Sequence, residues 1–175
     1  MASYKLLIVL VLSLIVLLNP CFGLNEVVTK TCQQTRDPQF CLDMFKSDAR
    51  SDAVRDANAQ AKLALSIAII KIQETLDTFP EVRDKLKDPV SQHRLDVCKS
   101  DYDGAYQGYT EAYFRVEIKA YWDAMMATAN ATKFVSDCEN VFHSGSPITE
   151  SPFAAVNQKL TRFAVIIYGI ISVAA

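Results

Sequence analysis

The chain has 175 residues, 22% of them charged, and a formal net charge of −2 at pH 7. A slightly acidic chain lacks the basic excess of nucleic-acid-binding proteins, so we expect no nucleic-acid partner. Hydrophobic residues make up 50% of the chain, which is enough for one buried core, and the length predicts one ordinary domain.

Residues 1–23 have the three parts of a secretory signal peptide. Lys5 gives the positive start, an apolar run follows over 6–18, and Cys21 and Gly23 stand at the −3 and −1 positions of a cut after Gly23. The run is shorter than the roughly 20 residues that a membrane span needs, which favours cleavage over an anchor. We therefore expect export and a mature chain over 24–175.

Cleavage would also change the cysteine count from odd to even. Of the five cysteines, Cys21 lies in the leader, and four remain in the body: Cys32, Cys41, Cys98 and Cys138. Four cysteines in an exported chain are typical of two disulfides rather than free thiols.

Residues 24–50 predict a small helical hairpin outside the main helices. Cys32 and Cys41 flank a turn in which Asp37 has the character of an N-cap and Pro38 that of the first residue of a short helix. We expect a disulfide between these two cysteines across the turn.

Residues 51–175 predict four amphipathic helices. Apolar residues recur at three- and four-residue steps over about 52–79, from 89 to about 116, over 121–142, and from 153 to the chain end. Pro80 is expected to end the first helix or to follow it directly. Four such helices with short connections predict an all-α, antiparallel up-and-down four-helix bundle, extended by the N-terminal hairpin.

The spacing of Cys98 and Cys138 supports this arrangement. Both fall on the inward stripes of the second and third helices, and they are equally far from Ile118, where the helical pattern breaks. Residues equally far from the turn of an antiparallel helix pair lie side by side. We therefore expect a Cys98–Cys138 disulfide between these helices.

The sequence carries no nucleophile elbow, phosphate-binding glycine loop or zinc-protease helix motif, so we expect no catalytic residues and no cofactor. His93 and His143 share the midpoint of the Cys98–Cys138 pair, which raises a Cys₂His₂ zinc site as an alternative. Each histidine lies five residues from its cysteine and so points about 140° away from it on a helix. Surface histidines and no metal are the better interpretation.

Three aromatic residues are candidates for contact with a partner protein. Tyr106, Tyr113 and Trp122 lie off the inward stripes, and tyrosine and tryptophan are favoured at interfaces. The alternative is that they pack within the bundle.

Asn130-Ala131-Thr132 is an N-glycosylation sequon within a predicted helix, and the sequence leaves its occupancy open. The apolar run over 163–175 fits either the fourth helix or a lipid-anchor signal. Because it continues the helical stripe that begins at residue 153, we favour the helix and expect no stable membrane anchor.

The order of these features resembles the plant invertase and pectin methylesterase inhibitor family over nearly the whole mature chain. The resemblance rests on the signal peptide, the cysteine spacing, the helix order and short segments that include Thr31-Cys32-Gln33-Gln34-Thr35, Asp137-Cys138-Glu139, Phe142 and Asn157. It implies a helical bundle with the disulfides Cys32–Cys41 and Cys98–Cys138. It also implies a non-enzymatic protein that is secreted to the apoplast and cell wall, or to the vacuole, and blocks the active site of a carbohydrate enzyme.

The family divides between two targets, pectin methylesterase and acid invertase. Some invertase inhibitors carry a Pro-Lys-Phe motif where this chain has Tyr121-Trp122-Asp123, which favours pectin methylesterase here. The expected partner is therefore pectin methylesterase, with acid invertase as the alternative, bound by a monomer in a 1:1 complex. A ligand-carrying or signalling bundle without an enzyme target is the alternative from another class.

Overall fold

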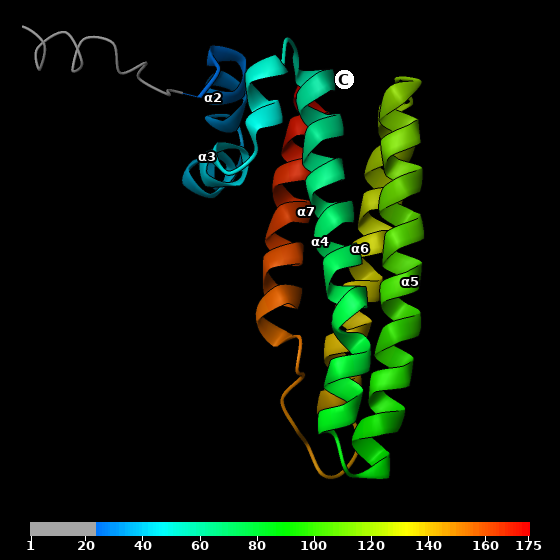
Figure 1. Cartoon of the computed structure of the whole chain (residues 1–175). Helices are drawn as coiled ribbons and strands as arrows, with labels where there is room; N and C mark the ends of the chain where they lie inside the picture. The colour runs from blue at the N-terminus through cyan, green and yellow to red at the C-terminus, as the bar shows by residue number, and fades with distance from the viewer. Residues whose placement is uncertain (1–23) are drawn as a thin grey trace, which may run out of the picture.

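The computed structural model describes residues 24–175, and the expected signal peptide lies outside the described residues. Within that part the structure is helical throughout (Figure 1). Two short helices and one 3₁₀ turn come first: α2 (Glu26–Cys32), α3 (Pro38–Lys46) and η1 (Ala49–Ala53). Four long helices follow: α4 (Ala57–Lys85), α5 (Pro89–Glu117), α6 (Tyr121–His143) and α7 (Ala154–Ala174).

The four long helices run alternately down and up, as Figure 1 shows. The short helices α2 and α3 lie beside the upper end of α4 and α7, which is also the end that holds the α5–α6 turn and the C-terminus. The predicted antiparallel up-and-down bundle with an N-terminal helical hairpin is confirmed.

Aspartate side chains mark several of the helix starts. Asp37, Asp56 and Asp88 each accept a hydrogen bond from a backbone N–H in the first turn of α3, α4 and α5. Such caps satisfy N–H groups that have no partner inside the helix. The cap at Asp56 also explains why α4 begins at Ala57 and not near residue 52, where the apolar pattern starts: residues 49–53 form the 3₁₀ turn instead.

The prediction that Pro80 ends the first long helix is wrong. Helix α4 continues through Pro80 to Lys85. Proline removes one backbone hydrogen bond, but the Pro80 side chain faces solvent while Phe79 is anchored in the core, with its ring stacked 4.4 Å from that of Phe153. Core packing therefore holds the helix together past the proline.

Two disulfides join the elements that the cysteine spacing predicts. Cys32 and Cys41 link α2 to α3, and Cys98 and Cys138 link α5 to α6 with a Cα–Cα distance of 4.2 Å. The chain turns at Ile118, the residue after α5, so the predicted midpoint of the α5–α6 pair is correct.

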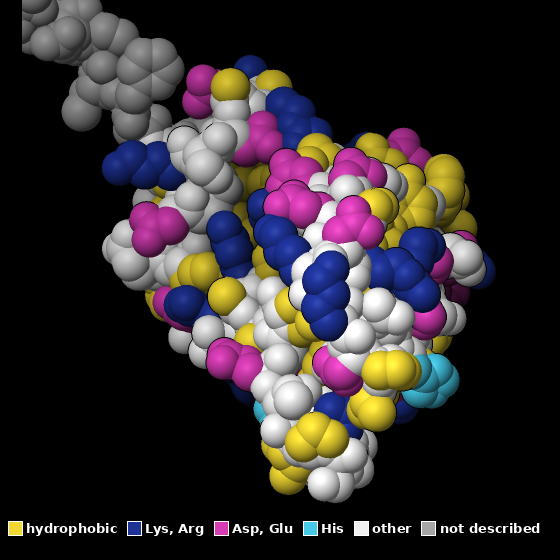
Figure 2. Space-filling model, turned by 60° about the horizontal axis from the view of Figure 1, so that its bottom comes forward, with side chains coloured by type: hydrophobic (Ala, Val, Ile, Leu, Met, Phe, Trp, Pro, Cys, Tyr) yellow, Lys and Arg dark blue, Asp and Glu magenta, His cyan; other side chains and the backbone are white. Residues whose placement is uncertain are grey.

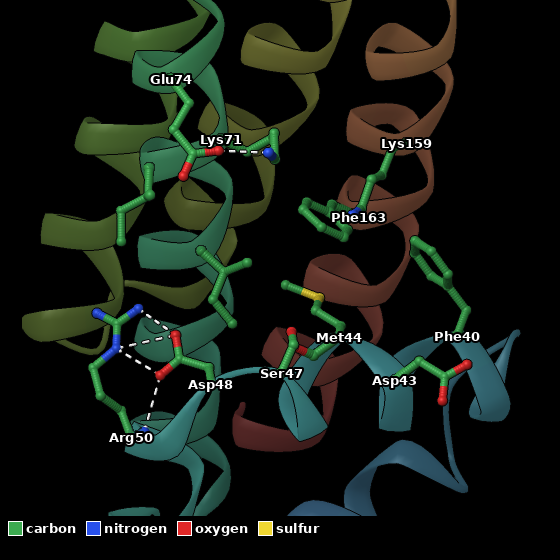
Figure 3. Close-up of a pocket in the computed structure, with 12 residues that line it drawn as sticks. Phe40, Asp43, Met44, Ser47, Asp48, Arg50, Lys71, Glu74, Lys159 and Phe163 are labelled. Atoms are coloured by element: carbon green, nitrogen blue, oxygen red, sulfur yellow. Dashed lines mark hydrogen bonds and ion pairs between the residues drawn. The ribbon is translucent and has the colours of Figure 1, made fainter.

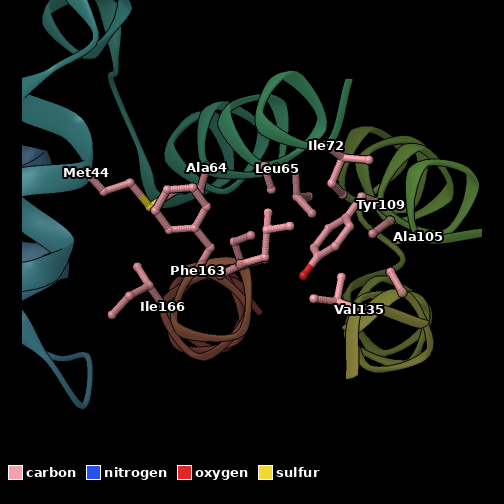
Figure 4. Packing of buried hydrophobic residues seen from close by; sticks show 14 of the residues in the cluster. Met44, Ala64, Leu65, Ile72, Ala105, Tyr109, Val135, Phe163 and Ile166 are labelled. Carbon is pink, nitrogen blue, oxygen red and sulfur yellow. The ribbon is translucent and has the colours of Figure 1, made fainter. Parts of the chain in front are cut away.

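Apolar side chains from all four long helices fill the space between them (Figure 4). Tyr102 and Tyr109 are fully buried, and each hydroxyl finds a partner: Tyr102 donates to Asn157 Oδ1 at 2.6 Å, and Tyr109 is 3.1 Å from Thr132 Oγ1. Burial raises the pKa of Tyr109 to about 12. Both tyrosines are thus neutral hydrogen-bonding members of the core.

The N-terminal hairpin is held against α7 by one cluster of side chains. The Arg162 guanidinium lies 3.8 Å from the Phe40 ring centroid and bonds the Asp37 carboxylate at 2.6 Å. The Phe40 ring in turn lies 5.6 Å from that of Phe163. Helix α7 is the most apolar of the long helices, yet among the described residues no helix is long and apolar enough to span a bilayer.

Candidate protein-docking surface

The two histidines lie where the sequence predicts, on the surface. His93 is exposed in the first turns of α5, and His143 is exposed at the end of α6. In residues 24–175 no group of three or more His, Cys, Asp or Glu side chains is arranged to hold a metal ion.

The structure gives the three candidate aromatic residues different degrees of exposure. Trp122 is 68% exposed at the start of α6. Tyr106 and Tyr113 are half-buried against the core, and Tyr113 shares a hollow with Arg50 and Lys62 on the α4 side of α5. Of the three, Trp122 alone presents most of its side chain to a partner.

Two further exposed apolar residues, which were not among the three candidates, lie at the same turn as Trp122. Phe114 is 59% exposed in the last turn of α5, and Ile118 is 67% exposed at the turn itself. Phe114 and Trp122 are each four residues from Ile118, so the same symmetry that pairs the cysteines places them on the two sides of one turn. The signal for this apolar tip was therefore in the sequence.

A long groove lies between α6 and α7. It consists of two adjoining hollows of about 970 and 710 Å³ that share Ser136 and Thr161. The larger hollow also touches the α2–α3 turn, because the Thr35 side chain packs on Gly169, where an added Cβ would lie 3.2 Å from Thr35 Cγ2.

Small and hydroxyl-bearing side chains line this groove. Ala129, Thr132, Ala164 and Gly169 leave it wide, and Val165 and Tyr168 are 42% and 46% exposed along its edge. A shallow surface with apolar edges and a row of hydroxyls suits a protein ligand, because it offers both buried area and hydrogen bonds. Figure 2 shows acidic and basic side chains interspersed on another view of the molecule, so the charge there is mixed in sign.

A smaller cavity of about 310 Å³ separates the hairpin from α4 and α7 (Figure 3). Four of its charged residues form two pairs: Arg50 bonds Asp48 at 2.5 Å, and Lys71 bonds Glu74 at 2.5 Å. Met44 and Phe163 form part of its apolar wall. Because these charges already have partners, the cavity is better explained as the joint between hairpin and bundle than as a ligand site.

Residues 26–170 match the family described as plant invertase/pectin methylesterase inhibitor. The chain belongs to this family. Its members are inhibitor proteins, and the chain is accordingly not an enzyme. A surface that binds a protein is therefore the kind of site to expect in this family, and the apolar tip and the α6–α7 groove are the two candidates.

Relatives within the inhibitor family share both sequence and fold with the chain. Pectinesterase inhibitor 5 of Arabidopsis thaliana is 29% identical over 140 residues, which cover 80% of this chain and 78% of the relative. A pectinesterase inhibitor of Actinidia deliciosa is 26% identical over 88 residues, or 50% of this chain and 47% of the relative.

Solved structures extend the similarity of fold. The crystal structure of mutant form A of a pectin methylesterase inhibitor from Arabidopsis matches with a TM-score of 0.68 at 19% sequence identity. The match covers 85% of this chain and 97% of the chain in that crystal structure. A second crystal structure of a pectin methylesterase inhibitor, from Arabidopsis thaliana, matches with a TM-score of 0.61 at 19% sequence identity. This match covers 83% of this chain and 93% of the other chain.

The carboxylate of Asp101 is partly buried, and its hydrogen bonding is incomplete. Asp101 lies on α5, and its Oδ2 is buried without a hydrogen-bond partner among the described residues. Burial raises the pKa of Asp101, and the nearby charge of Asp137 on α6 raises it further, while Lys133 lowers it. The α5–α6 seam thus holds two carboxylates close together beside the Cys98–Cys138 disulfide.

Proposed function

We propose that this protein inhibits pectin methylesterase by binding to it as an intact bundle and covering its substrate cleft. The observation that carries the proposal is the family match over 26–170, together with two relatives that are both named pectinesterase inhibitors. Inhibition by occlusion needs no catalytic group on the inhibitor.

The docking face that we assign is the α6–α7 groove together with Trp122. This face combines the exposed aromatic residues Trp122 and Tyr168 with the hydroxyls of Thr132 and Ser136. Exposed aromatic side chains are enriched among residues that dominate binding energy, because they bury a large area at a low entropic cost.

Rigidity of the bundle favours such a mechanism. The Cys98–Cys138 disulfide and the contact of Gly108 with Ala131 fix α5 against α6, so α6 presents its outer face in one position. A surface that is already ordered loses little conformational entropy on binding. We expect a monomer that forms a 1:1 complex.

The site of action that we propose is outside the cell, in the apoplast and cell wall, with the vacuole as the alternative. The apolar leader over 1–23 supports entry into the secretory pathway. Two disulfides support an oxidising compartment, since such bonds persist there and are rare in the cytosol.

Acid invertase is the second candidate target. The matched family includes inhibitors of invertase as well as of pectin methylesterase, so acid invertase is also a candidate target. Against it stands the segment Tyr121-Trp122-Asp123 at the place where some invertase inhibitors have Pro-Lys-Phe. A ligand-carrying bundle has less support, because buried apolar side chains fill the space between the four helices.

The test is to incubate the oxidised protein with a plant pectin methylesterase and, separately, with an acid invertase at mildly acidic pH. We expect stoichiometric loss of methanol release from pectin and unchanged sucrose hydrolysis. Loss of sucrose hydrolysis alone would transfer the assignment to invertase, and loss of neither activity would refute the inhibitor function.

A matched pair of variants tests the docking face in the same assay. Ala129→Arg places a long cation in the α6–α7 groove at an exposed position, and Gln107→Arg makes the same change of charge on the exposed outer side of α5. We expect the first variant to weaken inhibition at least tenfold and the second to leave it within twofold, which is roughly what a buried clash and a remote surface charge produce. Equal potency of the two would move the docking face away from the groove.

A further inference from the structure

Asn130 is an asparagine to which the structure gives no internal role. Asn25 caps α2, Asn58 donates to the Val116 carbonyl, and Asn157 lies in the core between Tyr102 and Glu139. Asn130 is exposed in the middle of α6, where asparagine is a weak helix former, and no hydrogen bond of its side chain is found within residues 24–175.

Asn130 is also the asparagine of the one Asn-x-Ser/Thr sequon in the chain, Asn130-Ala131-Thr132. The Thr132 hydroxyl donates to the Thr128 carbonyl at 2.7 Å and lies 3.1 Å from the Tyr109 hydroxyl, so it is fixed in the folded protein. Glycan transfer occurs on the chain before it folds, and the fold has only to leave the modified side chain in solvent. Asn130 meets that condition.

The surroundings of Asn130 offer an apolar surface that a sugar can cover. Met126 and Phe134 lie one turn before and one turn after it on the same helix face, and they are 49% and 39% exposed. Phe134 lies directly beside Gly104, whose added Cβ would be 3.0 Å from the Phe134 ring.

We propose that Asn130 carries an N-linked glycan on the α5 side of α6, and that this face is therefore one that the target enzyme leaves uncovered. In the transfer, the Asn130 side-chain nitrogen bonds to the anomeric carbon of an oligosaccharide donated by a lipid diphosphate. The amide loses one proton, and the lipid diphosphate leaves. The second half of the proposal rests on the proposed inhibitor function.

The groove-lining residues lie on the neighbouring face of α6, toward α7. Ala129, Thr132 and Ser136 face α7, whereas the neighbours of Asn130 on its own face, Met126 and Phe134, do not line the groove. A glycan at Asn130 would thus cover the apolar stripe beside the α5–α6 seam and leave the α6–α7 groove open.

The modification is tested by expressing the full chain in the secretory pathway of a eukaryotic cell and measuring the protein mass with and without an N-glycosidase. We expect one glycan on the wild type and on Thr132→Ser, which keeps both sequon and hydroxyl. Asn130→Gln and Thr132→Val should carry none. Wild-type protein without a glycan, whether secreted or retained, would overturn the assignment of Asn130.

The position of the glycan is tested by moving it. Gln34 and Arg36 are exposed residues of the α2–α3 turn that line the groove, and the changes Gln34→Asn and Arg36→Thr create a sequon with Thr35. Combined with Asn130→Gln, they transfer the glycan to the groove. We expect glycosylated wild type and Asn130→Gln to inhibit pectin methylesterase within twofold of each other. The relocated glycan should abolish inhibition until the N-glycosidase removes it.

The outcomes separate the two ideas. A large gain in potency on Asn130→Gln would place the target on the glycan-bearing face and overturn the second half of the proposal. If no form inhibits, the proposed function fails and that half fails with it, while the mass measurement still decides whether Asn130 is modified.

Discussion

Gly108 of α5 lies directly against Ala131 of α6. A Cβ added to Gly108 would stand 2.8 Å from the Ala131 Cβ and 3.1 Å from its Cα. Atoms at these distances overlap, and one of the two is backbone of a fixed helix. The missing side chain at Gly108 is thus what lets α5 and α6 approach closely between the Cys98–Cys138 disulfide and the α5–α6 turn.

Gly108→Ala should therefore destabilise the protein. The overlap with Ala131 costs about 1–3 kcal/mol, and the better helix propensity of alanine returns up to about 1 kcal/mol. We expect a net loss of about 1–2 kcal/mol in the free energy of unfolding, measured by urea denaturation with an unchanged m-value.

Gly104→Ala is the matched control for this change. The added Cβ meets the Phe134 ring at 3.0 Å, but that side chain is 39% exposed and can rotate away. The gain in helix propensity then dominates, and we expect the free energy of unfolding to rise by between zero and about 1 kcal/mol. An equal loss in both variants would contradict the close-approach role of Gly108.

The two disulfides should contribute unequally to stability. The Cys98–Cys138 bond closes a loop with a sequence separation of 40 and the Cys32–Cys41 bond one of 9. In the chain-entropy model these loops give about 4 and about 3 kcal/mol. We expect Cys98→Ala/Cys138→Ala to lower the free energy of unfolding more than Cys32→Ala/Cys41→Ala does, in parallel urea titrations. The reverse order would mean that hairpin docking matters more than loop closure.

Much of the fold is predictable because its signals are local or symmetric. Each long helix shows an apolar stripe, and Cys98 and Cys138 locate the α5–α6 turn through their shared midpoint at Ile118. The prediction that α4 ends at Pro80 failed because the sequence does not reveal that the Pro80 ring faces solvent while Phe79 is held in the core. At this position tertiary packing outweighs the local preference of proline to end a helix.

The candidate site was less accessible to sequence reasoning. Tyr106 and Tyr113 lie at the edge of the α5 stripe, and whether such positions are buried depends on how closely α4 packs there. Phe114 and Ile118 were open to prediction, because Phe114 and Trp122 are each four residues from the predicted turn at Ile118. The α6–α7 groove results from the small residues Ala129, Ala164 and Gly169 on different elements, and no single stretch of sequence shows such a combination.

The three candidate aromatic residues differ in exposure, so we expect alanine substitutions at these positions to differ in their effects on binding and stability. Trp122→Ala should weaken inhibition of pectin methylesterase about tenfold or more, as roughly expected for an exposed aromatic residue in an interface, with little change in stability. Tyr106→Ala and Tyr113→Ala should instead lower the free energy of unfolding by about 1–3 kcal/mol, because they remove half-buried rings packed on the core. Inhibition curves and urea titrations on the same preparations separate the two effects. Unchanged inhibition by Trp122→Ala would remove it from the docking face.

Asp101 predicts a pH dependence of stability. Burial and the charge of Asp137 raise its pKa in the folded protein above the ordinary carboxyl value of the unfolded chain. The ionised form therefore destabilises the fold at neutral pH, and this destabilisation is relieved as the pH falls through the folded-state pKa. Asp101→Asn removes the buried charge and should raise the free energy of unfolding at neutral pH. At about pH 4, near the ordinary carboxyl pKa, the gain should shrink.

Asp103→Asn is the control for this last experiment. Asp103 lies on the same helix and bonds Lys99 at 3.0 Å on the surface, where such pairs contribute roughly 0–1 kcal/mol. We expect Asp103→Asn to be neutral or slightly destabilising at neutral pH, opposite in sign to Asp101→Asn. Urea titrations of both variants at the two pH values measure the difference, and a loss of stability in Asp101→Asn at neutral pH would show that Asp101 is stabilised as a carboxylate after all.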